Sequence, residues 1–170
     1  MRIEVRQERR TDFEAIREVN RRAFGQAQEA DLIDALRSSG AASLSLVATV
    51  DEHIVGHIMY SPVQLGEIEG GGLGPMAVLP EYQRRGIGSR LVGTGNRQLE
   101  IAGCPFIVVL GHAEFYPRFG FKPARPMGIT CEWDVPDNVF LILVLDPIRM
   151  QGASGLARYR HEFSDLTKSG

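Results

Sequence analysis

The alternation of apolar and polar residues along the chain predicts a series of short strands. Residues 3–7 alternate as a half-buried strand does, and Asp51-Glu52-His53 has the length and polarity of a hairpin loop between two β-rich runs. Residues 66–72 are glycine-rich and are expected to form a turn or a bulged loop. We expect residues 129–133 to be the hairpin partner of the last strand. The predicted strands are residues 3–7, 43–50, 54–62, 73–79, 106–110, 129–133 and 138–145.

Helical spacing of apolar residues appears in four other segments. Thr11-Asp12-Phe13-Glu14 has the pattern of a capping box and would begin the first helix. Gly40 would end the second helix, and Gly93 and Gly95 weaken the third by about 1 kcal/mol each relative to alanine. We expect chance tolerance to explain these two glycines rather than a packed neighbour or ligand. The residues expected to face inward are Phe13, Ile16, Val19 and Phe24, then Leu32, Ile33 and Leu36 within residues 30–37, and Leu91, Leu99 and Ala102 within residues 88–102; a short helix is expected over residues 114–119.

The order of these elements predicts an α/β fold in which a mixed central sheet is flanked by helices. We expect one domain over residues 1–146, followed by an arm over residues 147–170. Within the arm, residues 156–163 are expected to dock on the domain, and the chain end is expected to fray. A length of 170 residues suits one compact domain of this kind.

Composition narrows the possible partners. The formal charge of -2 provides no broad attraction for nucleic acid or an anionic membrane, so neither is expected as a partner. The charged N-terminus and the lack of an apolar run of about 20 residues predict a cytoplasmic protein. Cys104 and Cys131 lack metal-ligand spacing and the histidines are scattered, so no metal site is expected.

Candidate chemistry concentrates in residues 74–89, which are predicted to form a strand, a glycine-bearing loop and a helix start. The first N–H groups of a helix lack partners within the helix, and its dipole favours negative charge, so this junction can bind phosphate. Gly86 and Gly88 would let phosphate approach the backbone, and Arg84 and Arg85 would add charge. The alternative is a polar turn whose glycines only relieve steric crowding. A P-loop and a dinucleotide-binding loop are both excluded, because the required Gly-Lys-Ser/Thr ending and third glycine are absent.

Gln83-Arg84-Arg85-Gly86-Ile87-Gly88 resembles the acetyl-CoA signature of the GNAT acetyltransferase superfamily, Gln/Arg-x-x-Gly-x-Gly/Ala. The flanking blocks at residues 73–78 and 115–121 resemble the YhbS-like branch of predicted acetyltransferases. The motif-level resemblance is confined to residues 73–121. It implies a GNAT-type sheet with helices on both faces and an N-acetyltransferase that uses acetyl-CoA as cosubstrate.

The resemblance also implies roles for individual residues. The backbone of Met76, Ala77 and Val78 would pair with the pantetheine arm like an added strand. The pyrophosphate would lie on the N–H groups of residues 84–89. The full set of implied acetyl-CoA-binding residues is Met76, Ala77, Val78, Gln83, Arg84, Arg85, Gly86, Ile87, Gly88, Ser89, Gly111, His112 and Phe115.

Tyr116 stands where similar enzymes place a tyrosine beside the thioester sulfur, and the resemblance implies that it stabilises or protonates the leaving thiolate. Without the resemblance, the favoured interpretation of Tyr116 is a core residue of an aromatic cluster with Phe115, Phe119 and Phe121. His112 is a secondary candidate for contact with pantetheine or for proton relay. The base that deprotonates the amine is left open between Glu69, His57, a water chain and no base at all.

Two other functions stay open from the sequence. A catalytically silent acyl-CoA sensor would keep the phosphate loop, and a structural or partner-binding domain would use an exposed strand edge without any cofactor. The acceptor amine is not identified by the sequence, because variable loops meet it in this superfamily. The oligomeric state is expected to be a monomer or a homodimer, with residues 156–163 available for contact.

Overall fold

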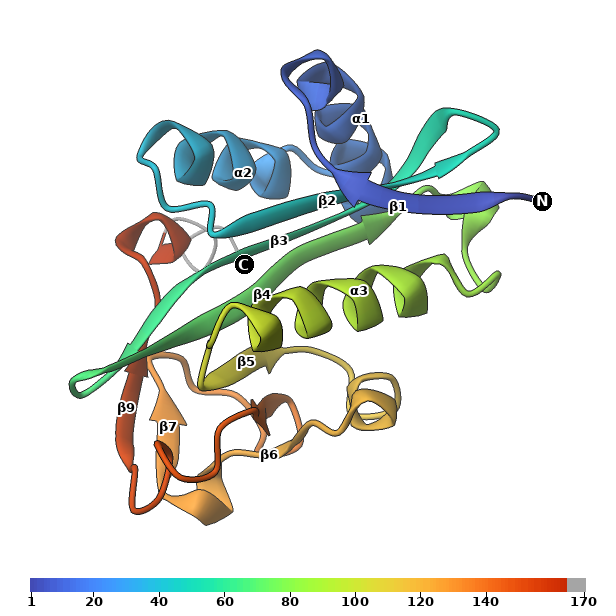
Figure 1. Ribbon diagram of the computed structural model, residues 1–170. Coiled ribbons are helices and arrows are strands. Elements are labelled where there is room, and N and C mark those ends of the chain that lie inside the picture. The colour runs from blue at the N-terminus through green and yellow to red at the C-terminus, as the bar shows by residue number, and fades with distance from the viewer. Residues whose placement is uncertain (165–170) are drawn as a thin grey trace.

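A nine-stranded mixed sheet forms the centre of the protein in the computed structural model, which describes residues 1–164 (Figure 1). The main path runs β1-β2-β3-β4-β5-β8-β6, and β9 joins β3 to β7. Neighbours pair antiparallel except for β4 with β5 and β7 with β9, which are parallel. The strands are β1 Ile3–Gln7, β2 Leu44–Val50, β3 His53–Leu65, β4 Ile68–Val78, β5 Phe106–Leu110, β6 Lys122–Pro123, β7 Ile129–Cys131, β8 Phe140–Val144 and β9 Gly155–Arg158.

Helices cover both faces of this sheet, which confirms the predicted α/β fold (Figure 1). Helices α1 and α2 lie on one face, and α3 lies on the other. Single 3₁₀ turns fill several connections. The α-helices are α1 Phe13–Phe24, α2 Gln28–Ser38 and α3 Ile87–Ile101, and the 3₁₀ helices are η1 Arg10–Asp12, η2 Pro80–Tyr82, η3 Tyr116–Phe119, η4 Arg125–Met127 and η5 His161–Phe163.

Strand alternation divides the core into two apolar layers. Successive residues of a strand point to opposite faces, so Val47 and Met59 pack under α1 and α2 while Leu46 and Ile58 pack under α3. All four side chains are fully buried. A sheet that is buried on both faces in this way needs long apolar runs, and β2 and β3 provide them.

Gly95 is required by a close neighbour, contrary to the expectation of chance tolerance. A Cβ atom at Gly95 would overlap the ring and hydroxyl of Tyr60. That hydroxyl donates a hydrogen bond to Oδ1 of Asn96 at 2.8 Å, which holds α3 tightly against β3. A Cβ added at Gly93 would have nothing within 4 Å, so no packed neighbour requires glycine at this position.

The glycine-rich segment at residues 66–72 is mostly strand and not the predicted loop. Only the turn between β3 and β4 lies outside the strands, and Gly66 takes φ 59° there. The later glycines make room for the core, because a Cβ at Gly70 would overlap Phe106 and one at Gly72 would lie 2.8 Å from Val63. Close packing against neighbours, rather than turn formation, therefore explains this composition.

The pairing predicted for residues 129–133 is wrong. β7 pairs in parallel with β9, and β6 takes the position beside β8. β9 also pairs with β3, through Gln64 and Leu65, so part of the predicted arm is a strand of the sheet. The chain end, for which fraying was predicted, lies outside the described residues beyond Ser164.

Two helix predictions are also corrected. The expected capping box is absent, since Asp12 is the residue before α1 and makes no side-chain cap. Its carboxylate instead accepts hydrogen bonds from Arg6 at 2.7 Å and from the Arg9 N–H at 2.7 Å. Phe24 and Ala102 were expected to be buried, but both are exposed because each lies at the end of its helix, where the sheet no longer covers it.

Candidate functional site

The sheet opens between β4 and β5. These strands pair only from Gly71 to Leu73, after which β4 continues to Val78 in contact with β3 alone. Pro75 follows the opening and has no N–H with which to extend the parallel ladder. Within residues 1–164, no strand pairs with the β5-facing edge of β4 beyond Leu73. The split therefore presents unpaired backbone groups of the kind that can bind an extended ligand.

A cavity of about 1330 Å³ lies at this split. Its walls come from the end of β4, the loop and first turn of α3, the segment from the end of β5 to η3, the α1–α2 region and the end of the described chain. The predicted cofactor-binding residues are brought together here, with one exception. Those that line the cavity are Met76, Ala77, Val78, Gln83, Arg84, Gly86, Ile87, Gly88, Ser89, Gly111, His112 and Phe115, together with the predicted catalytic Tyr116.

The N-terminus of α3 is open toward ligands because no side chain caps it. Gly86 precedes the helix with φ 82°, and Arg84 also has a positive φ, of 64°. A non-glycine residue in this conformation costs of the order of 1–3 kcal/mol and is concentrated at functional sites. N–H groups at a helix N-terminus and the helix dipole can together bind an anion.

Three polar side chains of the loop have different environments. Gln83 donates a hydrogen bond from Nε2 to the carbonyl of Val78 at 3.0 Å, so it ties the loop to the end of β4. Arg84 is exposed and lines the cavity. Arg85 is the exception among the predicted residues, since its guanidinium lies over the ring of Tyr82 and contacts the Sδ of Met1.

Tyr116 lies at the start of η3 with only 6% of its surface exposed. Its ring makes edge-to-face contacts with Phe115 and Phe121, at centroid distances of 5.0 and 5.7 Å. A side chain at Gly111 would overlap this ring, so the glycine fixes how closely the end of β5 approaches. Tyr116 is thus both a member of the aromatic cluster and a wall of the cavity.

Burial raises the pKa of Tyr116 to about 12. The phenol is therefore protonated at neutral pH, and its O–H is available as a hydrogen-bond donor. His112 places its carbonyl under the same turn, where it accepts hydrogen bonds from the N–H groups of Phe115 and Tyr116. The predicted short helix at residues 114–119 is confined to a single 3₁₀ turn with Pro117 near its start.

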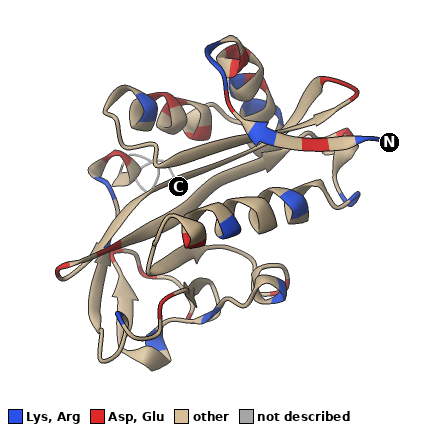
Figure 2. Cartoon of the chain, viewed as in Figure 1, with Lys and Arg blue, Asp and Glu red and all other residues tan. Residues whose placement is uncertain are grey.

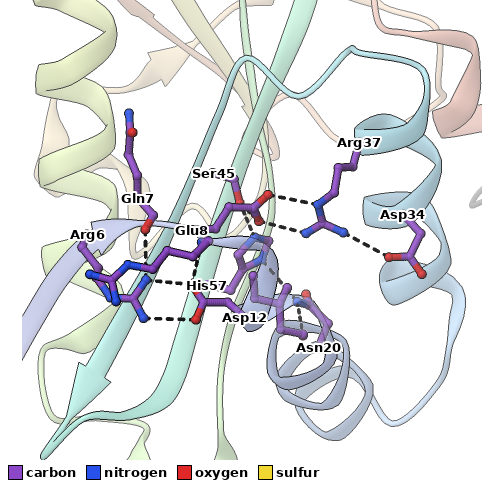
Figure 3. Close-up of polar contacts among 11 residues, drawn as sticks. Arg6, Gln7, Glu8, Asp12, Asn20, Asp34, Arg37, Ser45 and His57 are labelled. Atoms are coloured by element: carbon purple, nitrogen blue, oxygen red, sulfur yellow. Dashed lines mark hydrogen bonds and ion pairs between the residues drawn. The ribbon is translucent and has the colours of Figure 1, made fainter.

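Neither Glu69 nor His57, the two side chains considered as a base, lines the cavity. Glu69 is exposed on β4, near the hairpin turn to β3. His57 is completely buried on β3 within a polar network beneath α1 and α2 (Figure 3). Its Nε2 lies 2.9 Å from the Ser45 Oγ, and its Nδ1 lies 3.3 Å from the Asn20 Nδ2.

Burial keeps His57 neutral. Desolvation lowers the pKa of His57 to about 3, against the smaller opposing effect of Glu8. Nδ1 accepts from the amide of Asn20, Nε2–H donates to Ser45, and Ser45 donates to Oε1 of Glu8 at 2.6 Å. Burial alone would raise the pKa of Glu8, but hydrogen bonds from Arg37 and Ser45 outweigh it and lower the pKa.

A model of the acetyltransferase (GNAT) domain matches residues 41–123. The chain is 42% identical over 136 residues to the uncharacterized N-acetyltransferase YjhQ of Escherichia coli K12, covering 76% of this chain and 75% of that protein. It is 34% identical over 163 residues to the uncharacterized N-acetyltransferase YhbS of the same strain, covering 94% and 98%. The chain belongs to the GNAT acetyltransferase family.

Two solved GNAT structures resemble this one over nearly its whole length. Escherichia coli YhbS in complex with CoA has a TM-score of 0.92 at 32% identity, covering 96% of this chain and 93% of that chain. A GNAT family acetyltransferase from Brucella melitensis in complex with acetyl-CoA has a TM-score of 0.81 at 36% identity, covering 95% and 98%. The GNAT-type fold inferred from the sequence is thereby confirmed.

One wall of the GNAT cavity was missed by the sequence analysis. It is contributed by α1, α2 and the end of the described chain, which are far from the signature in the sequence. The one signal in the sequence is Phe24, an aromatic residue directly before Gly25 at the end of its helix. In the structure its side chain is 41% exposed. The missed lining residues are Ala23, Phe24, Glu29, Leu32, Tyr159 and Phe163.

Acidic and basic residues are interspersed over the helices and loops of this GNAT domain (Figure 2). The drawn elements therefore carry no extended region of one sign. Among residues 1–164, no group of three or more histidine, cysteine or acidic residues is arranged to hold a metal ion. The described part of the chain also contains no helix that is long and apolar enough to cross a membrane.

Proposed function

We propose that the protein is an acetyl-CoA-dependent N-acetyltransferase in which an acceptor amine attacks the thioester directly. One observation carries this proposal: a single cavity joins the unpaired edge of β4, the uncapped N-terminus of α3 and the hydroxyl-bearing Tyr116. These are the groups needed for the three parts of acetyl-CoA: an amide-containing arm, a pyrophosphate and a leaving sulfur. CoA and acetyl-CoA in the two solved GNAT structures support the same assignment.

Backbone groups dominate the proposed binding of acetyl-CoA. Met76, Ala77 and Val78 would pair with the pantetheine amides through main-chain polarity. The N–H groups from Arg84 to Ser89 would hold the pyrophosphate. We expect a Kd in the low-to-middle micromolar range, which corresponds to a binding free energy of about 7–8 kcal/mol in magnitude. Calorimetry with CoA and with acetyl-CoA measures it.

Acyl transfer forms a C–N bond to the acetyl carbon as the C–S bond breaks, and the sulfur leaves with the bonding electrons. The proton that the amine nitrogen loses passes to water or to the leaving thiolate. Tyr116 is proposed to donate its O–H to that sulfur. Its pKa of about 12 lies well above the value of about 8.5 for a cysteine thiol. Complete proton transfer from the phenol to a thiolate is therefore uphill, and Tyr116 would stabilise the thiolate chiefly by a hydrogen bond.

The decisive experiment measures acetyl-CoA-dependent release of free thiol across small amines, amino-acid derivatives and peptides with lysine or N-terminal amines. Thiol release that requires both the protein and an amine supports the proposal. Binding of acetyl-CoA without thiol release for any amine class would instead identify a sensor. Failure of the folded protein to bind CoA or acetyl-CoA at millimolar concentration would leave only a structural or partner-binding role.

A further inference from the structure

The cavity has a second end that the acetyl-CoA signature does not form. Ala23 and Phe24 from the end of α1, with Glu29 and Leu32 of α2, make one side of this end. Tyr159 and Phe163 make the other, and η5 packs against α2 to hold the two sides together. We call these six residues the distal wall. It faces the same cavity as Tyr116 and therefore lies where a second reactant can meet the thioester.

Tyr159 is firmly held in the distal wall. Its ring makes edge-to-face contacts with Trp133 and Phe163, at centroid distances of 5.0 and 5.2 Å. Its backbone N–H donates to the carboxylate of Glu132 at 2.8 Å. The ring also lies against Gly72, where a Cβ would come within 3.0 Å of it. These contacts leave the aromatic ring little freedom to turn away from the cavity.

The hydroxyl of Tyr159 has no partner among residues 1–164, although the residue is only 9% exposed. Burial raises the pKa of Tyr159, so the hydroxyl remains protonated at neutral pH. A buried hydroxyl without a hydrogen bond is costly, so a ligand group that reaches it gains a hydrogen bond that residues 1–164 do not supply. Tyr116 and Tyr159 both line this cavity.

The charge and polarity of the distal wall indicate the chemistry of its ligand. Glu29 is the single charged member of the wall, and its carboxylate accepts hydrogen bonds from Gln26 at 3.0 Å. It favours a positive group and disfavours a negative one. The remaining members, apart from the Tyr159 hydroxyl, are apolar and favour an apolar body. No member of the distal wall is a lysine or arginine that could pair with a carboxylate. The two arginines that line the cavity, Arg84 and Arg118, belong to the loop before α3 and to η3, and the Arg118 guanidinium lies over the ring of Phe115.

We propose that the distal wall binds the acceptor as a primary amine with an apolar body and no carboxylate, and that Tyr159 positions it through a hydrogen bond. This inference rests on the proposed N-acetyltransferase function. Glu29 attracts the ammonium form on entry, and the wall packs against the apolar body. Amino acids with a free carboxylate are poor acceptors, because Glu29 disfavours a negative group and no basic residue of the distal wall pairs with it.

Two probes that differ by one carboxylate test the acceptor class: 2-phenylethylamine and phenylalanine. With acetyl-CoA saturating, we expect kcat/KM for 2-phenylethylamine to exceed that for phenylalanine by about tenfold or more. Calorimetry on CoA-loaded protein should show the same order of affinity without any turnover. Equal or reversed preference, or no detectable binding of 2-phenylethylamine, would overturn the inference.

Two variants test the residues. Tyr159→Phe keeps the ring contacts and removes the hydroxyl, so KM for 2-phenylethylamine should rise about five- to tenfold while acetyl-CoA affinity stays within twofold. Glu29→Gln should reduce the preference over phenylalanine about threefold or more. Tyr60→Phe removes a buried hydroxyl that lies outside the cavity and should leave KM unchanged. An unaltered KM in Tyr159→Phe refutes the positioning role.

These outcomes separate the two proposals. If the N-acetyltransferase function is wrong, acetyl-CoA does not bind or no amine releases thiol. If only the acceptor class is wrong, thiol is released with other amines while 2-phenylethylamine neither binds nor reacts. Peptides with internal lysines belong to the same panel and would then show which amine class replaces the proposed one.

Discussion

The cavity at the sheet split and the polar network beneath α1 both bury titratable side chains, but they leave different groups unsatisfied. In the network, His57 has a partner on each ring nitrogen, and Glu8 accepts from Arg37 and Ser45 (Figure 3). Only the carbonyl oxygen of the Asn20 side chain lacks a partner there. In the cavity, the β5-facing edge of β4 beyond Leu73 has no strand partner among residues 1–164, and no described side chain caps the N-terminus of α3.

This difference teaches how burial should be interpreted in this protein. A strongly shifted pKa marks a functional site only where the group also faces space that a ligand can occupy. His57 has the shifted pKa without the space, whereas Tyr116 has both. We therefore expect changes in the cavity to affect chemistry and changes in the network to affect stability.

Tyr116→Phe should have the largest effect on chemistry. Loss of a positioned donor typically costs about 10²- to 10⁴-fold in turnover, so single-turnover kinetics should slow on that scale. Acetyl-CoA affinity should stay within a few fold, because the ring and its contacts with Phe115 and Phe121 remain. Near-normal chemistry in this variant would make Tyr116 a packing residue and His112 or bound water the next candidate.

Gly88→Glu should weaken acetyl-CoA binding by about 100-fold or more, because a negative side chain would enter the phosphate site at the N-terminus of α3. Gly93→Glu is a matched control on the same helix, since nothing lies within 4 Å of its added Cβ and the position is exposed. Calorimetry on both folded variants gives the comparison. Equal affinities would place the phosphates elsewhere.

Gly95→Ala and Gly93→Ala make the same gain in helix propensity at two positions of α3 that differ in packing. Gly93→Ala should raise the free energy of unfolding by up to about 1 kcal/mol. Gly95→Ala should lower it by about 1–3 kcal/mol, because the methyl group would overlap Tyr60. Urea denaturation measures both changes. Similar gains in the two variants would show that Tyr60 can move away without cost.

The titration of His57 is expected to affect stability and not chemistry. Its folded pKa of about 3 lies below the unfolded value of about 6.5, so the unfolded chain binds the extra proton between these values. The stability contribution is complete above pH 6.5 and is lost as the pH falls toward 3, by at most about 1.4 kcal/mol per pH unit. Urea denaturation at pH 7, 6 and 5 measures this slope.

His57→Gln keeps a polar side chain in the network and removes the titration. Its free energy of unfolding should depend less steeply on pH than that of the wild type. Turnover of the folded variant at neutral pH should be unchanged, because His57 does not line the cavity. A large loss of turnover would show that the network and the cavity are coupled.

Local sequence patterns determined several strands of the sheet and the loop before α3. The β-rich runs of β2 and β3 and the apolar block of β5 specify strands without reference to the rest of the chain. The loop before α3 could also be read directly, because a helix N-terminus and its glycines form an anion site from consecutive residues. Most of the residues predicted there do line one cavity.

Tertiary structure alone decided the features that join distant segments. Nothing local to residues 129–131 distinguishes pairing with β8 from pairing with β9, because strand partners depend on which edges the fold leaves free. Gly95 could be understood only once Tyr60 was seen against it. The distal wall combines Glu29 with Tyr159, which are separated by most of the chain, and no periodicity connects such residues. The sequence thus determined the proposed acetyl-CoA end of the cavity from neighbouring residues, whereas long-range packing decided the proposed acceptor end.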